Sequence, residues 1–267
     1  MDYKRITSGM IVTAVLAVIL LIQNSIITGF LFTIITLMAM YEYLEAVSKI
    51  SKPVKWLGYA SCVIVALINC IPEQYIKYVL MFSIPSILSI LYVHIIATDM
   101  EITFKDVAYT FVGICYIPFF FMFLSLINGM EKGKFLLGYV FMAAWGTDVF
   151  AYCVGMKLGK HKFSKVSPKK SVEGCIGGTI GAVLIILLYT FILNKYLSFD
   201  YRYLKMFLYG IILSLIGQLG DFSASAIKRY VNIKDYSNLL PGHGGVLDRI
   251  DSVLFIAPFA YMLFVML

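Results

Sequence analysis

Long apolar runs separated by short polar breaks dominate this 267-residue chain. Most runs approach or exceed the ~17 residues that a helix needs to cross the hydrocarbon core of a bilayer. No pattern typical of a parallel sheet accompanies them. The runs predict nine helices, at Ile6–Ile22, Ile26–Met40, Trp56–Ile71, Tyr78–Ala97, Val107–Ile127, Phe135–Gly155, Ile176–Leu193, Leu204–Gly220 and Ser252–Leu267.

The first two runs are separated only by Gln23, Asn24 and Ser25. A cleavable signal peptide also begins with cations and an apolar run, as do Lys4, Arg5 and the residues after them. No convincing small-residue cleavage site follows, so we interpret both runs as membrane spans.

Composition supports a membrane protein. Hydrophobic residues make up 61% and charged residues 14% of the chain, and its mean hydropathy is +0.88. Soluble domains average about 45–50% apolar and about 25% charged residues. We therefore expect an all-α, polytopic integral membrane protein with about nine transmembrane helices. The five cysteines are scattered without a Cys-x-x-Cys pair, and we interpret them as small hydrophobic residues.

The distribution of cations predicts the orientation. With a cytoplasmic N-terminus, nine crossings place most loop cations on the cytoplasmic side, as the positive-inside rule requires. The opposite loops still carry cations, so the asymmetry is a preference. The net charge of +7 is consistent with a protein that acts at an anionic membrane leaflet or on anionic substrates. An excess of cytoplasmic cations is, however, also usual for inner-membrane proteins. The cations assigned to the cytoplasm are Lys4, Arg5, Lys49, Lys52, Lys55, those from Lys157 to Lys170, Lys228, Arg229 and Lys234, and those opposite are Lys132, Lys134, Lys195, Arg202 and Lys205.

A single membrane domain, residues 1–267, is the simplest interpretation because the chain has no long linker, low-complexity tract or repeat. Residues 1–144 carry little unusual polarity and are expected to form mainly scaffold helices. Residues 145–267 are rich in charges and glycines and are expected to form the catalytic half. The absence of a targeting presequence favours a cell (inner or plasma) membrane over an organellar one.

Asp148 interrupts a run that is otherwise long enough to span a membrane. A charge at bilayer depth costs about 2.5–3.5 kcal/mol on insertion scales, so such residues usually face a cavity and have a function. Tyr152 follows at i+4 and shares the same helix face. The alternative is an offset helix that places Asp148 at the membrane interface.

A basic segment from Lys157 to Lys170 precedes an apolar helix that begins after Ser171. The first turn of a helix offers backbone N–H groups and a positive dipole end, an arrangement that binds phosphate. A basic cytoplasmic loop also follows from topology alone, and both interpretations remain open. The segment is no Walker A loop, because only three residues separate Gly155 and Gly159.

Charged residues gather again from Asp221 to Asp251. A helix that continues past Asp221 would carry a carboxylate, a hydroxyl and two cations on one stripe. Asp248 and Asp251 share a second face at i, i+3. The residues of the stripe are Asp221, Ser225, Lys228 and Arg229.

A turn containing Gly244 and Gly245 lies between these two groups and allows the backbone to approach a bulky anion. Carboxylates from two segments, set among lysines and arginines, are what a magnesium-bound polyphosphate requires. A salt-bridged interfacial loop would explain the charges but not the glycines.

The residues of this region carry a family resemblance. Ser225-x-Ile-Lys-Arg229, Lys234-Asp235 and Pro241-x-His-Gly-Gly-x-x-Asp-Arg-x-Asp251 resemble the signature of the membrane-embedded phosphatidate cytidylyltransferases, also called CDP-diacylglycerol synthases. More than ten positions agree at fixed spacing. The segment Thr147–Gly174, with Asp-x-x-Ala-Tyr and Ser-Pro-x-Lys-Ser-x-Glu-Gly, is similar to that family's second block. Residues 1–145 agree only in length and hydropathy, and Ala224 stands where the family often has glutamate.

The resemblance implies a reaction of phospholipid synthesis in which CTP and phosphatidate give CDP-diacylglycerol and pyrophosphate. It implies Mg²⁺ as the cofactor, with a second metal ion as an option, and Asp221, Asp248 and Asp251 as ligands. Asp221, Asp248, Lys228 and Arg229 would be catalytic, with the active site facing the cytoplasm. The partners would be CTP, phosphatidate, membrane lipids and a second copy in a homodimer, without nucleic acid. The residues implied to bind substrate are Asp148, Lys169, Lys170, Ser225, Lys234, His243, Gly244, Gly245 and Arg249.

Two other functions fit parts of the pattern. A lipid-alcohol kinase that uses CTP would present a similar basic, metal-binding face, but it would need a base near a hydroxyl, and the full signature argues against it. A secondary transporter would suit intramembrane Asp148 and Asp221 in glycine-broken helices. Inverted repeats would favour the transporter, and the sequence shows none.

Overall fold

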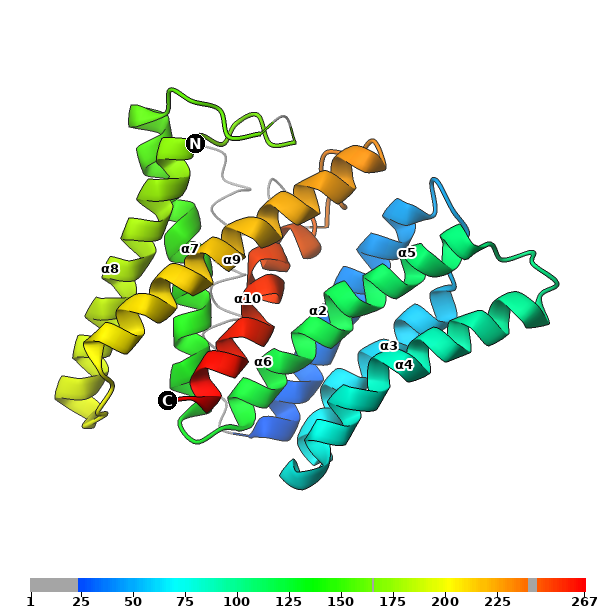
Figure 1. Ribbon diagram of the computed structural model, residues 1–267, viewed down its shortest axis with the longest axis horizontal. Coiled ribbons are helices and arrows are strands. Elements are labelled where there is room, and N and C mark those ends of the chain that lie inside the picture. Colours follow the sequence, from blue (N-terminus) through cyan, green and yellow to red (C-terminus); the bar gives the residue numbers. More distant parts are fainter. Residues whose placement is uncertain (1–23, 165, 240–243) are drawn as a thin grey trace. The chain divides into compact units, whose positions relative to one another are not determined.

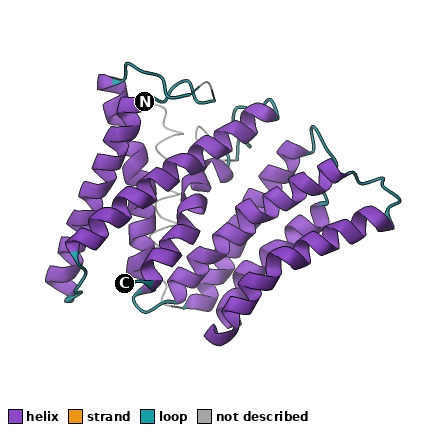
Figure 2. Ribbon diagram, viewed as in Figure 1, coloured by secondary structure: helices purple, strands orange, loops and turns teal. Residues whose placement is uncertain are grey.

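The computed structural model describes residues 24–164, 166–239 and 244–267, and within these ranges it consists of helices and connecting loops (Figure 2). The chain divides into two compact units. The first unit contains the described residues up to Gly129 and those from Val231 to Arg249. The second contains Met130–Tyr230, except residue 165, and Ile250–Leu267. The predicted division into scaffold and catalytic halves stays a prediction.

Eight of the nine predicted runs coincide with helices, and the first, Ile6–Ile22, lies outside the described residues. Most helices extend a few residues beyond the predicted run because polar residues at their ends still continue the backbone hydrogen-bond ladder. The helices in Figure 1 are α2 (Ser25–Val47), α3 (Lys55–Leu67), η1 (Ile68–Cys70), α4 (Glu73–Ala97), α5 (Phe104–Ile114), the π-helical η2 (Cys115–Phe119), α6 (Phe120–Gly129), α7 (Gly133–Leu158), α8 (Val172–Leu197), α9 (Tyr203–Tyr230) and α10 (Leu247–Val265).

Six helical segments among the described residues are long and apolar enough to cross a membrane. The prediction of an all-α, polytopic integral membrane protein is therefore confirmed, whereas the count of nine spans and the orientation stay predictions. The six segments are Ile26–Val47, Glu73–Ala97, Phe104–Gly129, Gly133–Leu158, Val172–Leu197 and Tyr203–Tyr230.

In the first unit, α2 packs against α3 and against the helical segment formed by α5, η2 and α6. Tyr43 of α2 is fully buried and donates a hydrogen bond to the carbonyl of Tyr109 at 2.8 Å. A Cβ at Gly113 would lie 2.4 Å from the Tyr43 ring, so glycine allows the two helices to pass this closely. These contacts fix the end of α2 that carries the neighbouring residue Glu42.

A buried carboxylate ties the loop after α2 to the start of α5. Asp106 accepts the backbone N–H of Lys52 at 2.5 Å and forms a capping box with Thr103. Its carboxylate accepts hydrogen bonds from the loop residue Lys52 and from Thr103 at the start of its own helix. We therefore interpret this acid as structural.

In the second unit, α7 and α8 run side by side over their length (Figure 1). The glycines of α8 face α7 directly. A Cβ at Gly178 would lie 2.8 Å from the carbonyl oxygen of Thr147, and one at Gly181 would lie 2.0 Å from the Phe150 ring. Small residues at such spacing allow membrane helices to approach closely. The glycine-rich start of α8 is thus explained by helix packing.

Hydrogen bonds between side chains connect α7, α8 and α9. Thr147 donates to Ser214 at 2.7 Å, and Ser214 donates to Thr179 at 3.2 Å. Gln218, one turn after Ser214, donates to Thr179 at 3.0 Å and to the carbonyl of Cys175 at 3.2 Å. Because buried polar groups need such partners in an apolar environment, this network fixes the register of the three helices.

Candidate functional site

The basic segment ahead of α8 folds back on itself as a short hairpin, with Lys162 opposite Ser171. We call its described residues, 159–164 and 166–171, the basic hairpin. The backbone N–H of Phe163 donates to the carbonyl of Lys170 at 3.0 Å. Glu173, in the first turn of α8, accepts the backbone N–H of His161 at 3.3 Å and contacts its Nδ1 at 2.6 Å. The hairpin and the start of α8 therefore hold each other in place.

The predicted helix start after Ser171 is confirmed, because α8 begins at Val172. Ser171 is the N-cap, and its hydroxyl oxygen accepts the backbone N–H of Gly174 at 3.1 Å. One N–H group of the first turn thus already has a partner within the chain. Phosphate binding at this helix start stays a prediction.

Lys170 lies close to several carboxylates of the second unit. Its ammonium forms an ion pair with Asp221 of α9, and both side chains are only about a quarter exposed, at 25% and 23%. Burial lowers the pKa of Lys170 below its usual value, whereas the nearby carboxylates of Asp148 and Asp251 act in the opposite direction. We call Asp148, Lys170, Asp221 and Asp251 the Lys170 cluster. The structure brings these four predicted site residues together from α7, the basic hairpin, α9 and α10.

The predicted stripe on α9 is confirmed as helical, because α9 continues to Tyr230. Ser225 is buried, Lys228 is half-buried and Arg229 is exposed. Lys228 is also close enough to Lys170 to lower its pKa further. Lys169, in contrast, is exposed, and the ion pair with Asp221 is made by its neighbour Lys170.

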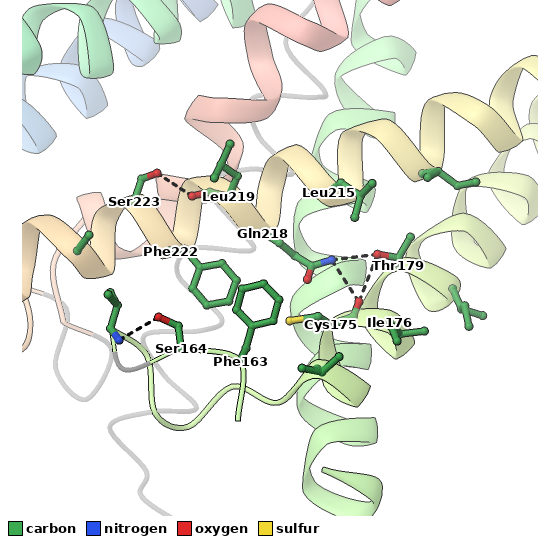
Figure 3. Close-up of a pocket in the computed structure, with 15 residues that line it drawn as sticks. Phe163, Ser164, Cys175, Ile176, Thr179, Leu215, Gln218, Leu219, Phe222 and Ser223 are labelled. Atoms are coloured by element: carbon green, nitrogen blue, oxygen red, sulfur yellow. Dashed lines mark hydrogen bonds between the residues drawn. The ribbon is translucent and has the colours of Figure 1, made fainter. Parts of the chain in front are cut away.

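An apolar groove of about 760 Å³ lies between α8, α9 and the basic hairpin (Figure 3). Ile180 and Leu215 line its walls, and Thr179 and Gln218 contribute polar atoms. The ring of Phe163 stacks on that of Phe222 beside the groove, with centroids 4.6 Å apart. The Lys170 ammonium lies 4.8 Å from the centre of the Phe222 ring, so the groove adjoins the Lys170 cluster.

In the first unit, Asp248 is buried, and its carboxylate is held by backbone N–H groups. Its Oδ2 accepts the N–H of Tyr236 and the N–H of Gly245, each at 2.9 Å. Asp248 and Asp251 lie three residues apart in α10, as predicted. The Asp248 side chain is therefore fixed in orientation by the loop that precedes its own helix.

The two glycines of the turn lie beside carboxylates of the chain itself. Gly244 has φ +82°, and a Cβ there would lie 2.9 Å from Oδ2 of Asp248. A Cβ at Gly245 would lie 2.5 Å from Oε2 of Glu42. Both positions thus require glycine, for a left-handed backbone at the first and for a close approach at the second. Substrate binding at these glycines stays a prediction.

Glu42 is a buried acid beside Asp248 that the sequence interpretation missed. Its side chain is only 2% exposed, and its carboxylate accepts hydrogen bonds from Val246 N, Leu247 N and the Ser237 hydroxyl. The predicted helix ended at Met40, just before this acid. The signal was the same one that identified Asp148, namely a carboxylate within a membrane-length helix.

Two of the remaining predicted residues of the first unit lie among the described residues. Lys234 and Arg249 are exposed, which suits contacts with a soluble anion. His243 lies outside the described residues.

No three His, Cys, Asp or Glu residues of the described ranges form a group that could hold a metal ion. Magnesium in phosphate-binding enzymes is usually held by one or two carboxylates, by water and by the substrate phosphates. Asp221 is oriented by contacts within the second unit, and Asp248 by contacts within the first. Magnesium binding by these carboxylates stays a prediction.

Comparison with known proteins identifies the family. A model of the cytidylyltransferase family matches residues 3–267. The chain is 41% identical over 164 residues to a protein of Bacillus subtilis named phosphatidate cytidylyltransferase, which covers 61% of this chain and 58% of that protein. A Thermotoga maritima protein of the same name is 38% identical over 169 residues, 62% of each chain.

These two alignments span less than two thirds of the relatives concerned. A Staphylococcus aureus protein, also named phosphatidate cytidylyltransferase, is 30% identical over 261 residues, which is 95% of this chain and 97% of that protein. The resemblance found in the sequence motifs is thereby confirmed, and the chain belongs to the cytidylyltransferase family.

Proposed function

We propose that the protein transfers the cytidylyl group of CTP to phosphatidate and so forms CDP-diacylglycerol and pyrophosphate. The observation that carries the proposal is the family match over residues 3–267, with relatives named phosphatidate cytidylyltransferase. The second unit supports it, because a partly buried lysine suited to a lipid phosphate adjoins a groove suited to an acyl chain.

The reaction depends on positioning of the two substrates more than on covalent catalysis by the protein. A phosphate oxygen of phosphatidate attacks the α-phosphorus of CTP, and the bond from that phosphorus to the oxygen of the β-phosphate breaks. A phosphomonoester is largely ionised near neutral pH, so no strong base is needed. The protein must hold two mutually repelling anions in line and neutralise charge on the leaving pyrophosphate. In the proposal, the predicted cations supply that positive charge, namely Lys170, Lys228, Arg229, Lys234 and Arg249.

The proposed cofactor is Mg²⁺, with Asp221 and Asp248 as ligands, Asp251 as a further carboxylate and a second ion as an option. When bound, the ion would neutralise phosphate oxygens and help to orient them. The protein itself fixes the orientation of each carboxylate. Asp248 is oriented by the backbone N–H groups of Tyr236 and Gly245, and Asp221 is oriented by Lys170.

An assay of the purified protein in detergent tests this function. Phosphatidate, labelled CTP and Mg²⁺ are expected to yield CDP-diacylglycerol and pyrophosphate in equal amounts. Formation of CDP and a newly phosphorylated lipid would instead indicate a CTP-dependent lipid kinase. No consumption of CTP, combined with ion-coupled transport in vesicles, would indicate a transporter.

The groove between α8 and α9 is the proposed site for an acyl chain of phosphatidate. Its volume of about 760 Å³ lies within the ~300–1,000 Å³ range of small-molecule sites, and its lining is almost entirely apolar. A chain in the groove would bring the lipid phosphate toward Lys170, because the Phe163–Phe222 stack joins the two.

A larger side chain in this groove is expected to weaken binding of the lipid substrate without affecting binding of CTP. Ile180→Trp should lower kcat/KM for long-chain phosphatidate about tenfold, because the loss of even two buried methylene groups amounts to ~1.6 kcal/mol. The KM for CTP should stay unchanged, and a short-chain phosphatidate should be affected less. Steady-state kinetics with both lipids measures the difference.

Leu188→Trp is the matched control, since Leu188 is exposed on the same helix, two turns beyond Ile180, and does not line the groove. Equal effects of the two tryptophans on long-chain phosphatidate would argue against an acyl chain in the groove.

The proposed orientation places the N-terminus and the basic hairpin in the cytoplasm, as the cation distribution favours. In a cysteine-free background, Ser164→Cys and Asn238→Cys should react with an impermeant maleimide only from the cytoplasmic side. Lys195→Cys should react only from the opposite side. Labelling of Ser164→Cys and Asn238→Cys from different sides would contradict this topology.

A further inference from the structure

Glu42 connects α2 to the backbone that precedes Asp248, more than 190 residues later in the chain. Its Oε1 accepts the N–H of Val246 at 2.9 Å and the hydroxyl of Ser237 at 2.5 Å. Its Oε2 accepts the N–H of Leu247 at 2.8 Å. Within the described residues, Glu42 forms no ion pair with a cation, so these hydrogen bonds compensate for burying its charge.

Two carboxylates share three successive backbone N–H groups at this point. Asp248 binds the N–H of Gly245, and Glu42 binds those of Val246 and Leu247. These groups lie at the start of α10, where the helix dipole favours negative charge. Asp248 is the next residue along the helix, so the position of its Cα follows the backbone that Glu42 holds.

We propose that Glu42 is a positioning residue for Asp248. It fixes the backbone of residues 245–247 and thereby holds the Asp248 carboxylate in the orientation that the reaction needs. This inference rests on the proposed function, in which Asp248 acts on the substrate phosphates.

Asp106 and Glu42 differ in the residues that their hydrogen bonds hold in place. Both acids are buried, and both accept backbone N–H groups. The bonds of Asp106 go to Lys52 and Thr103, which no part of the proposed mechanism uses. The bonds of Glu42 end at the residue beside Asp248, and Gly245 has no room for a side chain because the Glu42 carboxylate occupies it.

Glu42→Gln tests the proposal with little change of shape. Glutamine can still accept from Val246 and Ser237, but its amide NH₂ faces the N–H of Leu247, which leaves two donors opposed. The kcat of folded enzyme should fall about 10- to 100-fold, the expectation for losing a charge-assisted hydrogen bond. The KM for phosphatidate should stay near the wild-type value. Hydrogen exchange in peptides covering residues 244–249 should become faster.

Glu45→Gln is the matched control, because Glu45 lies one turn further along α2, is half exposed and pairs with Lys55. It should leave kcat and hydrogen exchange at residues 244–249 unchanged. Equal losses from both variants, or a Glu42→Gln protein with normal kcat per folded molecule, would overturn the proposal.

A double substitution tests the contact itself. In the wild-type background, Gly245→Ala should lower kcat, because the new Cβ would meet the Glu42 carboxylate. In a Glu42→Ala background that carboxylate is absent, so Gly245→Ala should lower kcat little further. Equal harm in both backgrounds would overturn the contact. If the wild-type protein formed no CDP-diacylglycerol, the proposed function would fail. Hydrogen exchange would still test Glu42 separately: faster exchange in Glu42→Gln would show that Glu42 holds residues 245–247, and unchanged exchange would show that it does not.

Discussion

Asp221→Asn and Asp248→Asn are each expected to leave an inserted protein that forms almost no CDP-diacylglycerol. Asparagine keeps the shape of the side chain but removes the anionic oxygen that a hard divalent ion prefers. Loss of ~4 kcal/mol of transition-state stabilisation corresponds to a decrease in kcat on the order of 1,000-fold. Raising CTP should not restore the rate. Product formation at increasing CTP and Mg²⁺ measures this.

Basic residues provide the contrast. Lys228→Ala and Arg249→Ala should leave the carboxylates in place and weaken only contacts with phosphate, at about 1.5–3 kcal/mol per charge-assisted hydrogen bond. The expected decrease is on the order of 10- to 100-fold in kcat/KM. Near wild-type turnover by folded Asp221→Asn, with ordinary Mg²⁺ dependence, would remove that residue from the mechanism.

The two aspartate variants should differ in stability. An asparagine at 248 can keep one oxygen on the N–H groups of Tyr236 and Gly245, so the loop before α10 should stay in place. An asparagine at 221 removes the carboxylate that pairs directly with the ammonium of Lys170. Asp221→Asn should therefore melt at a lower temperature than Asp248→Asn, and thermal unfolding in detergent separates this effect from the loss of turnover.

Helix positions were predictable because lipid requires continuous apolar runs, and eight runs coincide with helices. The ends were less predictable. The apolar run of α9 stops at Gly220, yet the helix continues to Tyr230, and Asp221 in this continuation pairs with Lys170 of the basic hairpin. Hydropathy alone does not contain such a partner, which comes from another segment.

Glu42 shows what local patterns omit. Its partners Ser237 and Leu247 lie 195 and 205 residues away along the chain. Periodicity describes which face of a helix is apolar, but not which distant loop meets its end. An acid within an apolar helix was nevertheless a usable signal, as it was for Asp148.

The glycines of the turn were predicted to admit an anion, and the structure adds which anions lie there. Spacing and residue type indicated a close approach of the backbone at Gly244 and Gly245. The nearest groups are the carboxylates of Asp248 and Glu42. The need for glycine followed from local geometry, whereas the neighbours depended on the tertiary fold.

Lys170→Met is expected to impair both stability and activity, and Lys170→Arg only partly. Methionine has a similar length but removes the charge that faces Asp221, Asp148 and Asp251. Carboxylates that have lost their common cation repel one another, and a lipid phosphate approaching them would be repelled as well. Arginine keeps the charge with a different shape, so some turnover should remain. Lys162→Met is the control, since Lys162 is exposed in the same hairpin.

Combining Lys170→Met with Asp221→Asn separates the two roles of this ion pair. Each single variant removes one member of the Lys170–Asp221 pair and leaves the other charge partly buried, whereas the double variant removes both members. The melting temperature of the double variant should therefore lie above the value expected from adding the two single effects. Its turnover should stay as low as that of Asp221→Asn, because restoring stability does not restore a phosphate contact or an anionic oxygen. Recovery of turnover together with stability would mean that Lys170 and Asp221 only hold the helices together. Strict additivity of the two stability effects would mean that the ion pair is not formed in the membrane protein.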